Sequence, residues 1–244
     1  MKINKTKCIV LLMTIISLTL LNADGFQFTP DRNLTISGGY VNSWLSGKYV
    51  DDYNSYLVGL DDLKSRHDFF IDISYLLTTK NDLLRFEPGL RYIHRGWTWW
   101  DGKQDIIDEQ GNNLGEVNTH AREKLYYLDA YINYKPKLMP SVFPYIGIGY
   151  SHLLDAKIHG KAFQDFPPVE IVDFSRNKSD NYKTSNFMMM AGMEIVVKEI
   201  ISLGLEYNRS INNILDWEGD AFGHENYKPK AYINSFLVSL GVKL

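Results

Sequence analysis

Apolar and polar side chains alternate along most of this chain, from Asn33 to the final residue, Leu244. Such alternation is typical of β-strands, whose successive side chains point to opposite faces. In the last stretch one face carries Tyr232, Phe236, Val238, Leu240, Val242 and Leu244, and the other carries Ser235, Ser239, Gly241 and Lys243. Repeated strands with one apolar face and one small, polar face are typical of a transmembrane β-barrel, where lipid covers the apolar side.

The chain holds eight such stretches, joined alternately by short turns and by long polar loops. The turns lie at Thr79–Asp82, at Pro136–Val142 and near Lys198, where a short helix over 195–201 is a second option. The loops lie between about 45 and 66, over 96–124, before about 184, and before the last strand. An even strand count with both termini on one side is typical of bacterial barrels. We therefore predict an all-β fold, an eight-stranded antiparallel up-and-down transmembrane β-barrel with four long external loops.

Charged residues share the predicted inner face with glycine and serine. The principal members of this predicted lumen network are Asp72, Arg85, Glu87, Arg91, Asp129 and Glu206. Charges of both signs in a lumen wide enough only for side chains will pair with one another. We therefore predict a polar plug that fills the barrel, and the alternative is a path for an ion or a substrate.

The N-terminus is typical of a secretory signal peptide. Lys2, Lys5 and Lys7 precede an apolar run that reaches Leu21. Ala23 then offers a small residue for cleavage. We predict a signal peptide over 1–23 and an outer-membrane barrel domain over 24–244. Export would leave 23 Lys and Arg against 29 Asp and Glu and remove the only cysteine. This acidic balance argues against a nucleic-acid partner. Outer-membrane lipid is expected to surround the apolar face of the barrel.

Three tryptophans cluster just past the third predicted strand, at Trp97, Trp99 and Trp100. They could belong to the outer aromatic girdle of a barrel, or their exposed rings could bind a glycan, a lipid or a protein. Other loop aromatics, such as Tyr49 and Phe222, favour the same use of the loops as a binding surface.

The sequence offers little support for catalysis. Ser151 and His152 are adjacent, but neighbours on a strand point to opposite faces and cannot pair within the wall. The loop histidines lack the recurring ligand spacing of a metal site. We therefore predict no catalytic residue, no cofactor-binding residue and no metal ligand.

Three segments resemble strands of the PorT-like outer-membrane β-barrel family: RFEPGLRYIHRG, LYYLDAYINYKP and FPYIGIGYSHLL. The chain departs from the pattern at Leu244, where many barrels end in phenylalanine, and at Glu206, where a basic residue is expected. The resemblance implies an eight-stranded outer-membrane barrel. It also implies that Pro88, which cannot donate to a strand ladder, is tolerated near the start of its strand.

We predict a non-enzymatic outer-membrane protein, structural or surface-binding through its external loops. Its partner would be an extracellular or periplasmic protein or a glycan. Two alternatives are a membrane-embedded lipid-modifying enzyme and a soluble periplasmic lipocalin-like barrel. The lipocalin-like barrel would keep its apolar face inside, whereas the charged residues here share a face with small residues.

Overall fold

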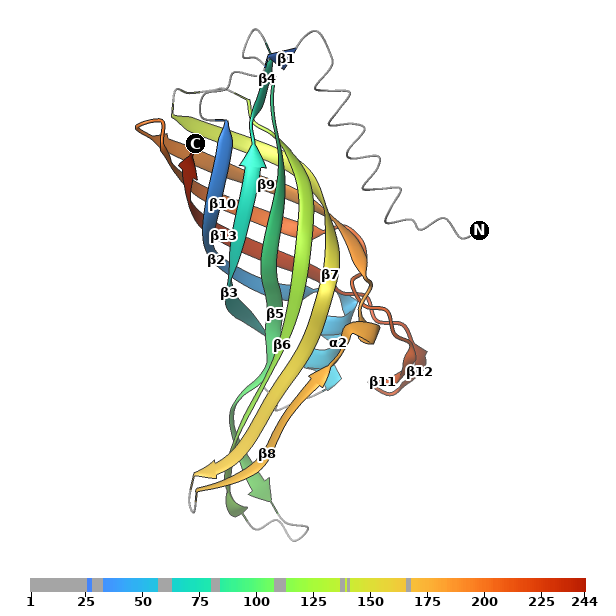
Figure 1. The fold of residues 1–244 in the computed structure, drawn as a ribbon. Coiled ribbons are helices and arrows are strands. Elements are labelled where there is room, and N and C mark those ends of the chain that lie inside the picture. The colour runs from blue at the N-terminus through green and yellow to red at the C-terminus, as the bar shows by residue number, and fades with distance from the viewer. Residues whose placement is uncertain are drawn as a thin grey trace.

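The eight predicted strands form a closed antiparallel barrel (Figure 1). The computed structural model describes residues 26–27, 33–56, 63–79, 84–107, 113–136, 139, 141–165 and 168–244. The barrel strands are β2 (Leu34–Ser46), β3 (Lys64–Tyr75), β5 (Arg85–Ile107), β6 (Asn113–Tyr134), β7 (Val142–Asp165), β9 (Ser185–Val197), β10 (Ile201–Ser210) and β13 (Tyr232–Lys243). Each pairs with the next, and β13 pairs with β2, so the predicted fold is confirmed.

The alternation of the sequence becomes an outer and an inner face. Exposed apolar side chains cover the outside of every barrel strand, among them Ile36, Ile71, Leu90, Leu128, Ile146, Met189, Leu203 and Leu240. The neighbours of these residues along each strand, such as Asp72, Arg91 and Asp129, are buried inside. A lipocalin-like barrel would show the opposite arrangement, so that alternative is wrong.

Short turns and both ends of the barrel sequence lie at one end of the cylinder, the turn end (Figure 1). There β4 (Leu77–Thr79) pairs with β1 (Phe26–Gln27) as well as with β5. The turn between β9 and β10 has positive φ at Lys198 (51°) and Glu199 (59°), as in the type I′ turns that join hairpins. A hairpin therefore replaces the helix that 195–201 could have formed.

At the opposite end, the loop end, the connections have more regular structure than the sequence predicts. The first contains helix α2 (Lys48–Tyr56), and the fourth contains the hairpin β11 (Gly219–Ala221) and β12 (His224–Tyr227). Residues 96–124 were predicted as a loop, but β5 instead continues to Ile107 and pairs with β6, which begins at Asn113. β7 likewise continues past the barrel and pairs with β8 (Pro168–Asn177), which a short 3₁₀-helix, η1 (Ser179–Asn181), follows. These strands project beyond the barrel in Figure 1.

The strand ladder is interrupted where proline would break it. β3 pairs with β5 as far as Ser74 and Gly89, and β4 resumes at Leu77 and Phe86, so Pro88 lies opposite the gap. Leu76, in the gap, donates its amide to the Asn33 carbonyl at 2.8 Å. The break also ends the alternation of β3, which explains why Leu77 is buried although its spacing continues the lipid-facing series of Ile71 and Ile73.

Aromatic residues mark two levels on the outer wall. The tilted rings of Phe86 and Tyr134 pack together near the turn end, with centroids 5.6 Å apart. Nearer the loop end, Tyr92 and Tyr126 both pack against His94. We call the pair near the turn end the lower girdle and the group nearer the loop end the upper girdle, although Figure 1 draws the turn end at the top. Outer-membrane barrels carry such girdles at both interfaces. No helix in the described part of the chain is long and apolar enough to cross a membrane. The predicted signal peptide, 1–23, lies outside the described residues.

Candidate functional site

The barrel interior gathers most of the residues that the sequence marks as special, and Arg91 of β5 lies at its centre. Its guanidinium donates to both carboxylate oxygens of Glu206, at 2.6 and 3.1 Å, and to Asp72 at 3.5 Å. Tyr131 donates to Asp72 at 2.6 Å, and Tyr145 donates to Glu206 at 3.0 Å. A bidentate pair between arginine and a carboxylate fixes both groups in position. The structure thus brings three predicted network residues together.

A second group lies nearer the turn end and centres on Lys135, which the sequence analysis missed. Its amino group contacts Glu87 at 2.5 Å and Glu194 at 2.6 Å, and Lys243 reaches Glu194 at 3.0 Å. Lys135 is only 5% exposed although it follows the last residue of β6. The missed signal is its spacing: it continues the inward series of Asp129 on the same strand.

A third group lies nearer the loop end. Arg95 binds Asp129 through two nitrogens, at 3.2 and 2.6 Å, and Ser151 donates to the same carboxylate at 2.5 Å. The sixth predicted network residue is Arg85 of β5. Its guanidinium lies over the ring of Phe143, 4.6 Å from the centroid.

The charges of the three groups and Arg85 balance. The cations are Arg85, Arg91, Arg95, Lys135 and Lys243, and the carboxylates are Asp72, Glu87, Asp129, Glu194 and Glu206. The polar cavity that Asp72, Arg91 and Glu206 help to line has a volume of about 40 Å³. Such a space holds only a few water molecules. The arrangement is that of a packed polar core, which we call the polar half of the interior.

The interior toward the loop end is apolar, in contrast to the polar lumen that the sequence predicts throughout. Its members include Val41, Leu45, Phe70, Ile93, Trp97, Leu125, Tyr127, Leu153, Ile214, Ile233 and Leu237, all buried in one cluster. We call this cluster the apolar half. Trp97 is 1% exposed, so its ring belongs neither to the girdle nor to an exposed binding surface. The sequence predicts a loop at Trp97, because Gly96 is typical of a strand end.

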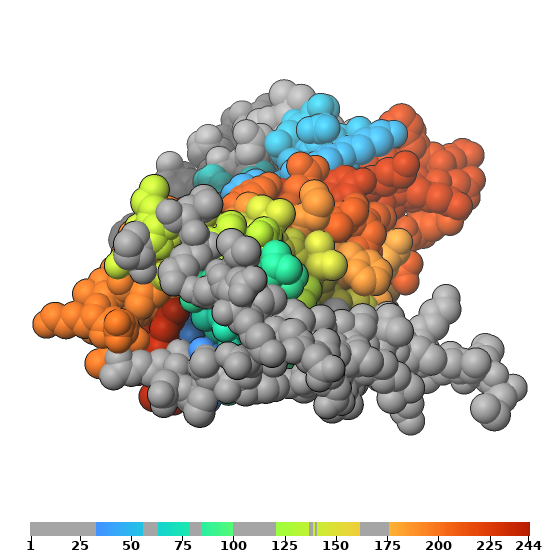
Figure 2. Space-filling model, turned by 90° about the horizontal axis from the view of Figure 1, so that it is seen from above, coloured from blue at the N-terminus to red at the C-terminus, as the bar shows by residue number. Residues whose placement is uncertain are grey.

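An aromatic cap closes the apolar half at the loop end. It consists of Tyr49 and Tyr53 of α2, Trp99 of β5, and Trp217, Phe222 and Tyr227 of the fourth connection. α2, in light blue, and the β11–β12 region, in orange-red, lie side by side in Figures 1 and 2. The loop aromatics with described side chains therefore pack on one another, and the predicted exposed aromatic surface is corrected at these positions. The side chain of Trp100 lies outside the described part.

One carboxylate is buried beneath the aromatic cap. Glu123 of β6 is 2% exposed and accepts hydrogen bonds from the hydroxyl of Tyr182 and from the indole of Trp99, the latter at 2.7 Å. It lies three residues beyond Tyr126, outside the upper girdle. Burial raises the pKa of the Glu123 carboxyl, and the two hydrogen bonds offset part of that rise. A buried carboxyl group in an aromatic setting is a structural feature that the sequence did not signal.

The adjacent serine and histidine of β7 do not pair with each other. Ser151 faces the interior and bonds Asp129, while the next side chain, His152, is on the other face and is partly exposed. Within the same part of the chain, no three His, Cys, Asp or Glu side chains come together as metal ligands would.

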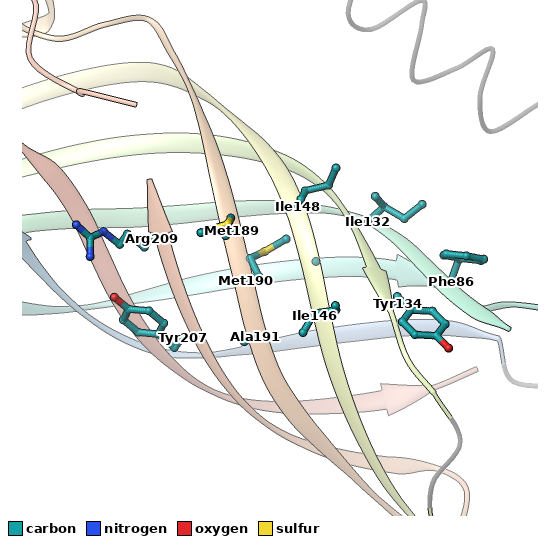
Figure 3. Close-up of a pocket in the computed structure, with 11 residues that line it drawn as sticks. Phe86, Ile132, Tyr134, Ile146, Ile148, Met189, Met190, Ala191, Tyr207 and Arg209 are labelled. Carbon is teal, nitrogen blue, oxygen red and sulfur yellow. The ribbon is translucent and has the colours of Figure 1, made fainter. Parts of the chain in front are cut away.

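A shallow apolar depression lies on the outer wall (Figure 3). It is lined mainly by outward residues of β5, β6, β7, β9 and β10, including Phe86, Ile132, Ile148, Met189 and Tyr207. The depression belongs to the surface that lipid covers in a membrane barrel, so hydrocarbon chains are its expected occupants.

Comparison with known proteins agrees with this architecture. The sequence profile described as "Outer membrane protein beta-barrel domain" matches residues 9–243. The chain belongs to this family. No curated protein matches the sequence significantly.

Among solved structures, the barrel is similar to Ail, the attachment invasion locus protein of Yersinia pestis. The two are 12% identical, with a TM-score of 0.44, over 88% of this chain and 99% of that one. It is also similar to Neisserial surface protein A (14%, TM-score 0.39, 86% and 97%). The outer membrane protease OmpT from Escherichia coli matches at 13%, with a TM-score of 0.41, over 91% and 99%.

Proposed function

We propose that this outer-membrane barrel is a non-enzymatic surface protein with a closed interior, and that it binds a partner through the sheet at its loop end. One observation carries the proposal: β5, β6 and β7 continue far past the upper girdle and, together with β8, make a four-stranded sheet. β6 alone continues from Tyr126 back to Asn113. Connections between adjacent strands need only a few residues, so such an extension favours a role of its own.

The edges of this sheet suggest how the partner is bound. Pairing between β3 and β5 ends at Lys64 and Thr98, so in the described chain the rest of β5 pairs with β6 alone. β8 likewise pairs only with β7 among the described strands. An unpaired edge offers backbone donors and acceptors to an extended segment of another protein. A protein partner that adds a strand therefore fits better than a glycan.

The proposal includes an orientation and a route. Residues 1–23 would direct export, the loop end would face outward, and the turn end would face the periplasm. The three strand motifs that resemble PorT-like barrels support placing the chain close to that group. Epitope tags near Gly111, outside the described residues, and at Ser179 should then react with antibody on intact cells. Tags that react only after the outer membrane is permeabilised would contradict the orientation.

The binding role is tested by shortening the sheet. Thr98 and Arg122 are paired, as are Ile158 and Arg176, so a short turn can join each pair and leave the barrel intact. We expect the shortened protein to keep heat-modifiable gel migration, because the closed barrel resists unfolding in detergent. We expect it to lose the adducts that the full-length protein forms on cross-linking of intact cells. The same adducts from both proteins would contradict the role of the sheet.

The closed interior is tested separately in planar bilayers. The polar half and the apolar half both fill the lumen, so the purified protein should show no steady conductance. A stable ion-selective channel would overturn this part of the proposal.

A further inference from the structure

β8 forms one border of the sheet that projects at the loop end (Figure 1). It has ten residues, and among the described strands it pairs only with β7. Its last residue, Asn177, lies opposite Lys157, two residues beyond the point where β7 passes Tyr126 of the upper girdle. Its first residue, Pro168, lies opposite Asp165 near the tip of the sheet. The outer side of β8 therefore runs from the membrane surface to the tip.

A strand edge of this length favours a role in binding. Natural β-proteins shorten, charge or cover their edge strands, because an exposed edge pairs readily with other chains. The other border of the sheet, β5, is less accessible at its base, where Trp99 packs against Tyr49 and Tyr53 of α2. β8 is therefore the better edge for the addition of a strand.

A second copy of β8 is itself a suitable strand to add. Two identical edges can meet antiparallel about a two-fold axis perpendicular to the strands, and each backbone hydrogen bond on one side of the axis then has an equivalent on the other. Such a contact is self-complementary and closed, so it needs no second kind of protein and does not grow into a fibre. It places the two barrels at opposite ends of the paired strands.

Two copies in the same membrane cannot pair in this way. Upright copies have their β8 strands pointing in the same direction, which excludes antiparallel pairing of β8 with β8. Joining β8 to β5 of a neighbour is excluded by the walls below, because β8 stands directly above β9 on the side of β7. Outward side chains such as Phe187 of β9 keep packed walls about 10 Å apart, whereas paired strands are about 4.8 Å apart. The antiparallel pair therefore requires two facing membranes.

We propose that this protein binds a second copy of itself across two facing outer membranes, by antiparallel pairing of β8 with β8. The inference rests on the binding role proposed for the outer sheet, and it names the partner. Ten paired residues at about 3.3 Å each span about 33 Å, so the contact bridges two closely apposed membranes.

Vesicle docking tests the partner. Protein with the change Cys8→Ser is purified from the outer membrane and placed in phosphatidylcholine vesicles that carry one of two dyes. We expect vesicles of the two colours to dock when both hold the protein, measured by fluorescence cross-correlation. We expect no docking between vesicles with protein and empty vesicles, because the contact needs a copy of β8 on each side.

Single cysteines then locate the contact. In the docked vesicles, a cysteine is placed at each position of β8 in turn, from 169 to 176. Only residues near a two-fold axis meet their own copies, so disulfide-linked dimers should peak at one or two positions and decrease on both sides. Glu225→Cys is the matched control, since Glu225 is exposed at the loop end but belongs to β12, outside the sheet. It should give little dimer, and heat-modifiable migration would show that each variant is folded.

Protein vesicles that fail to dock, or that dock equally well with empty vesicles, would overturn the proposal. Equal dimer yields along all of β8 would also overturn it, because they would indicate parallel strands in one membrane. Dimers that form only between a cysteine in β8 and one in β5 would have the same meaning. If shortening the sheet removes the adducts on cells but vesicles do not dock, the sheet binds a different protein. The binding role would then stand, and this inference would fail.

Discussion

The two halves of the interior close the same cylinder by opposite means. The polar half is filled by paired charges such as Arg91 and Glu206, whereas the apolar half is filled by buried rings and aliphatic chains around Trp97. Buried ion pairs gain little net stability but are costly to break, while apolar side chains stabilise in proportion to the area that they bury. Inward alternation therefore specifies only that a side chain is enclosed. What encloses it decides how the barrel responds to mutation.

The largest expected effect comes from breaking the polar half. Arg91→Ala would leave the carboxylates of Glu206 and Asp72 buried without their cation, so we expect a loss of about 3–5 kcal/mol in the free energy of unfolding. Denaturant titration in detergent measures the loss. Leu90→Ala, at the neighbouring lipid-facing position, is the control and should cost less. The double change Arg91→Met and Glu206→Gln should recover part of the loss, and no recovery would argue against a paired charge.

The apolar half should respond through cavity formation. Trp97→Ala removes a fully buried ring, and we expect a loss of about 3 kcal/mol in the free energy of unfolding. Trp44→Ala is the matched control, because that ring lies on the outer wall, 6.2 Å from Tyr207. Lipid can replace its contacts, so its loss should be smaller. Equal losses at the two positions would show that the apolar half is not packed as described.

The smallest expected change in the free energy of unfolding comes from replacing Glu123, the buried carboxylate described beneath the aromatic cap. Burial raises the pKa of Glu123 in the folded protein, so its contribution to stability is present at low pH and is lost as pH rises through the folded pKa. The stability advantage of the wild type over Glu123→Gln should therefore shrink as pH rises. Unfolding titrations of both proteins at several pH values measure it. An advantage that grows with pH would indicate a cationic partner instead.

Much of the barrel could be predicted because strand alternation is local. The period of two along β3, β5 and β10 fixes which side chains face inward, so Asp72, Arg91 and Glu206 were placed correctly. Their contacts could not be predicted, because Arg91 and Glu206 are 115 residues apart and meet only through the stagger of a closed sheet. Trp97 was misplaced for a related reason: glycine at position 96 resembled a strand end, although the alternation of Ile93 and Arg95 continues through it.

The continuation of β6 from the membrane wall into the outer sheet also has a geometric consequence. A strand rises about 3.3 Å per residue, so the stretch from Tyr126 to Asn113 reaches about 40 Å along its own axis. It is one hydrogen-bonded strand, paired on one side with β5 and over most of its length with β7 on the other. The sheet is therefore a continuous, hydrogen-bonded extension of the barrel wall. A partner bound there, as proposed, would be held away from the membrane by the length of these strands.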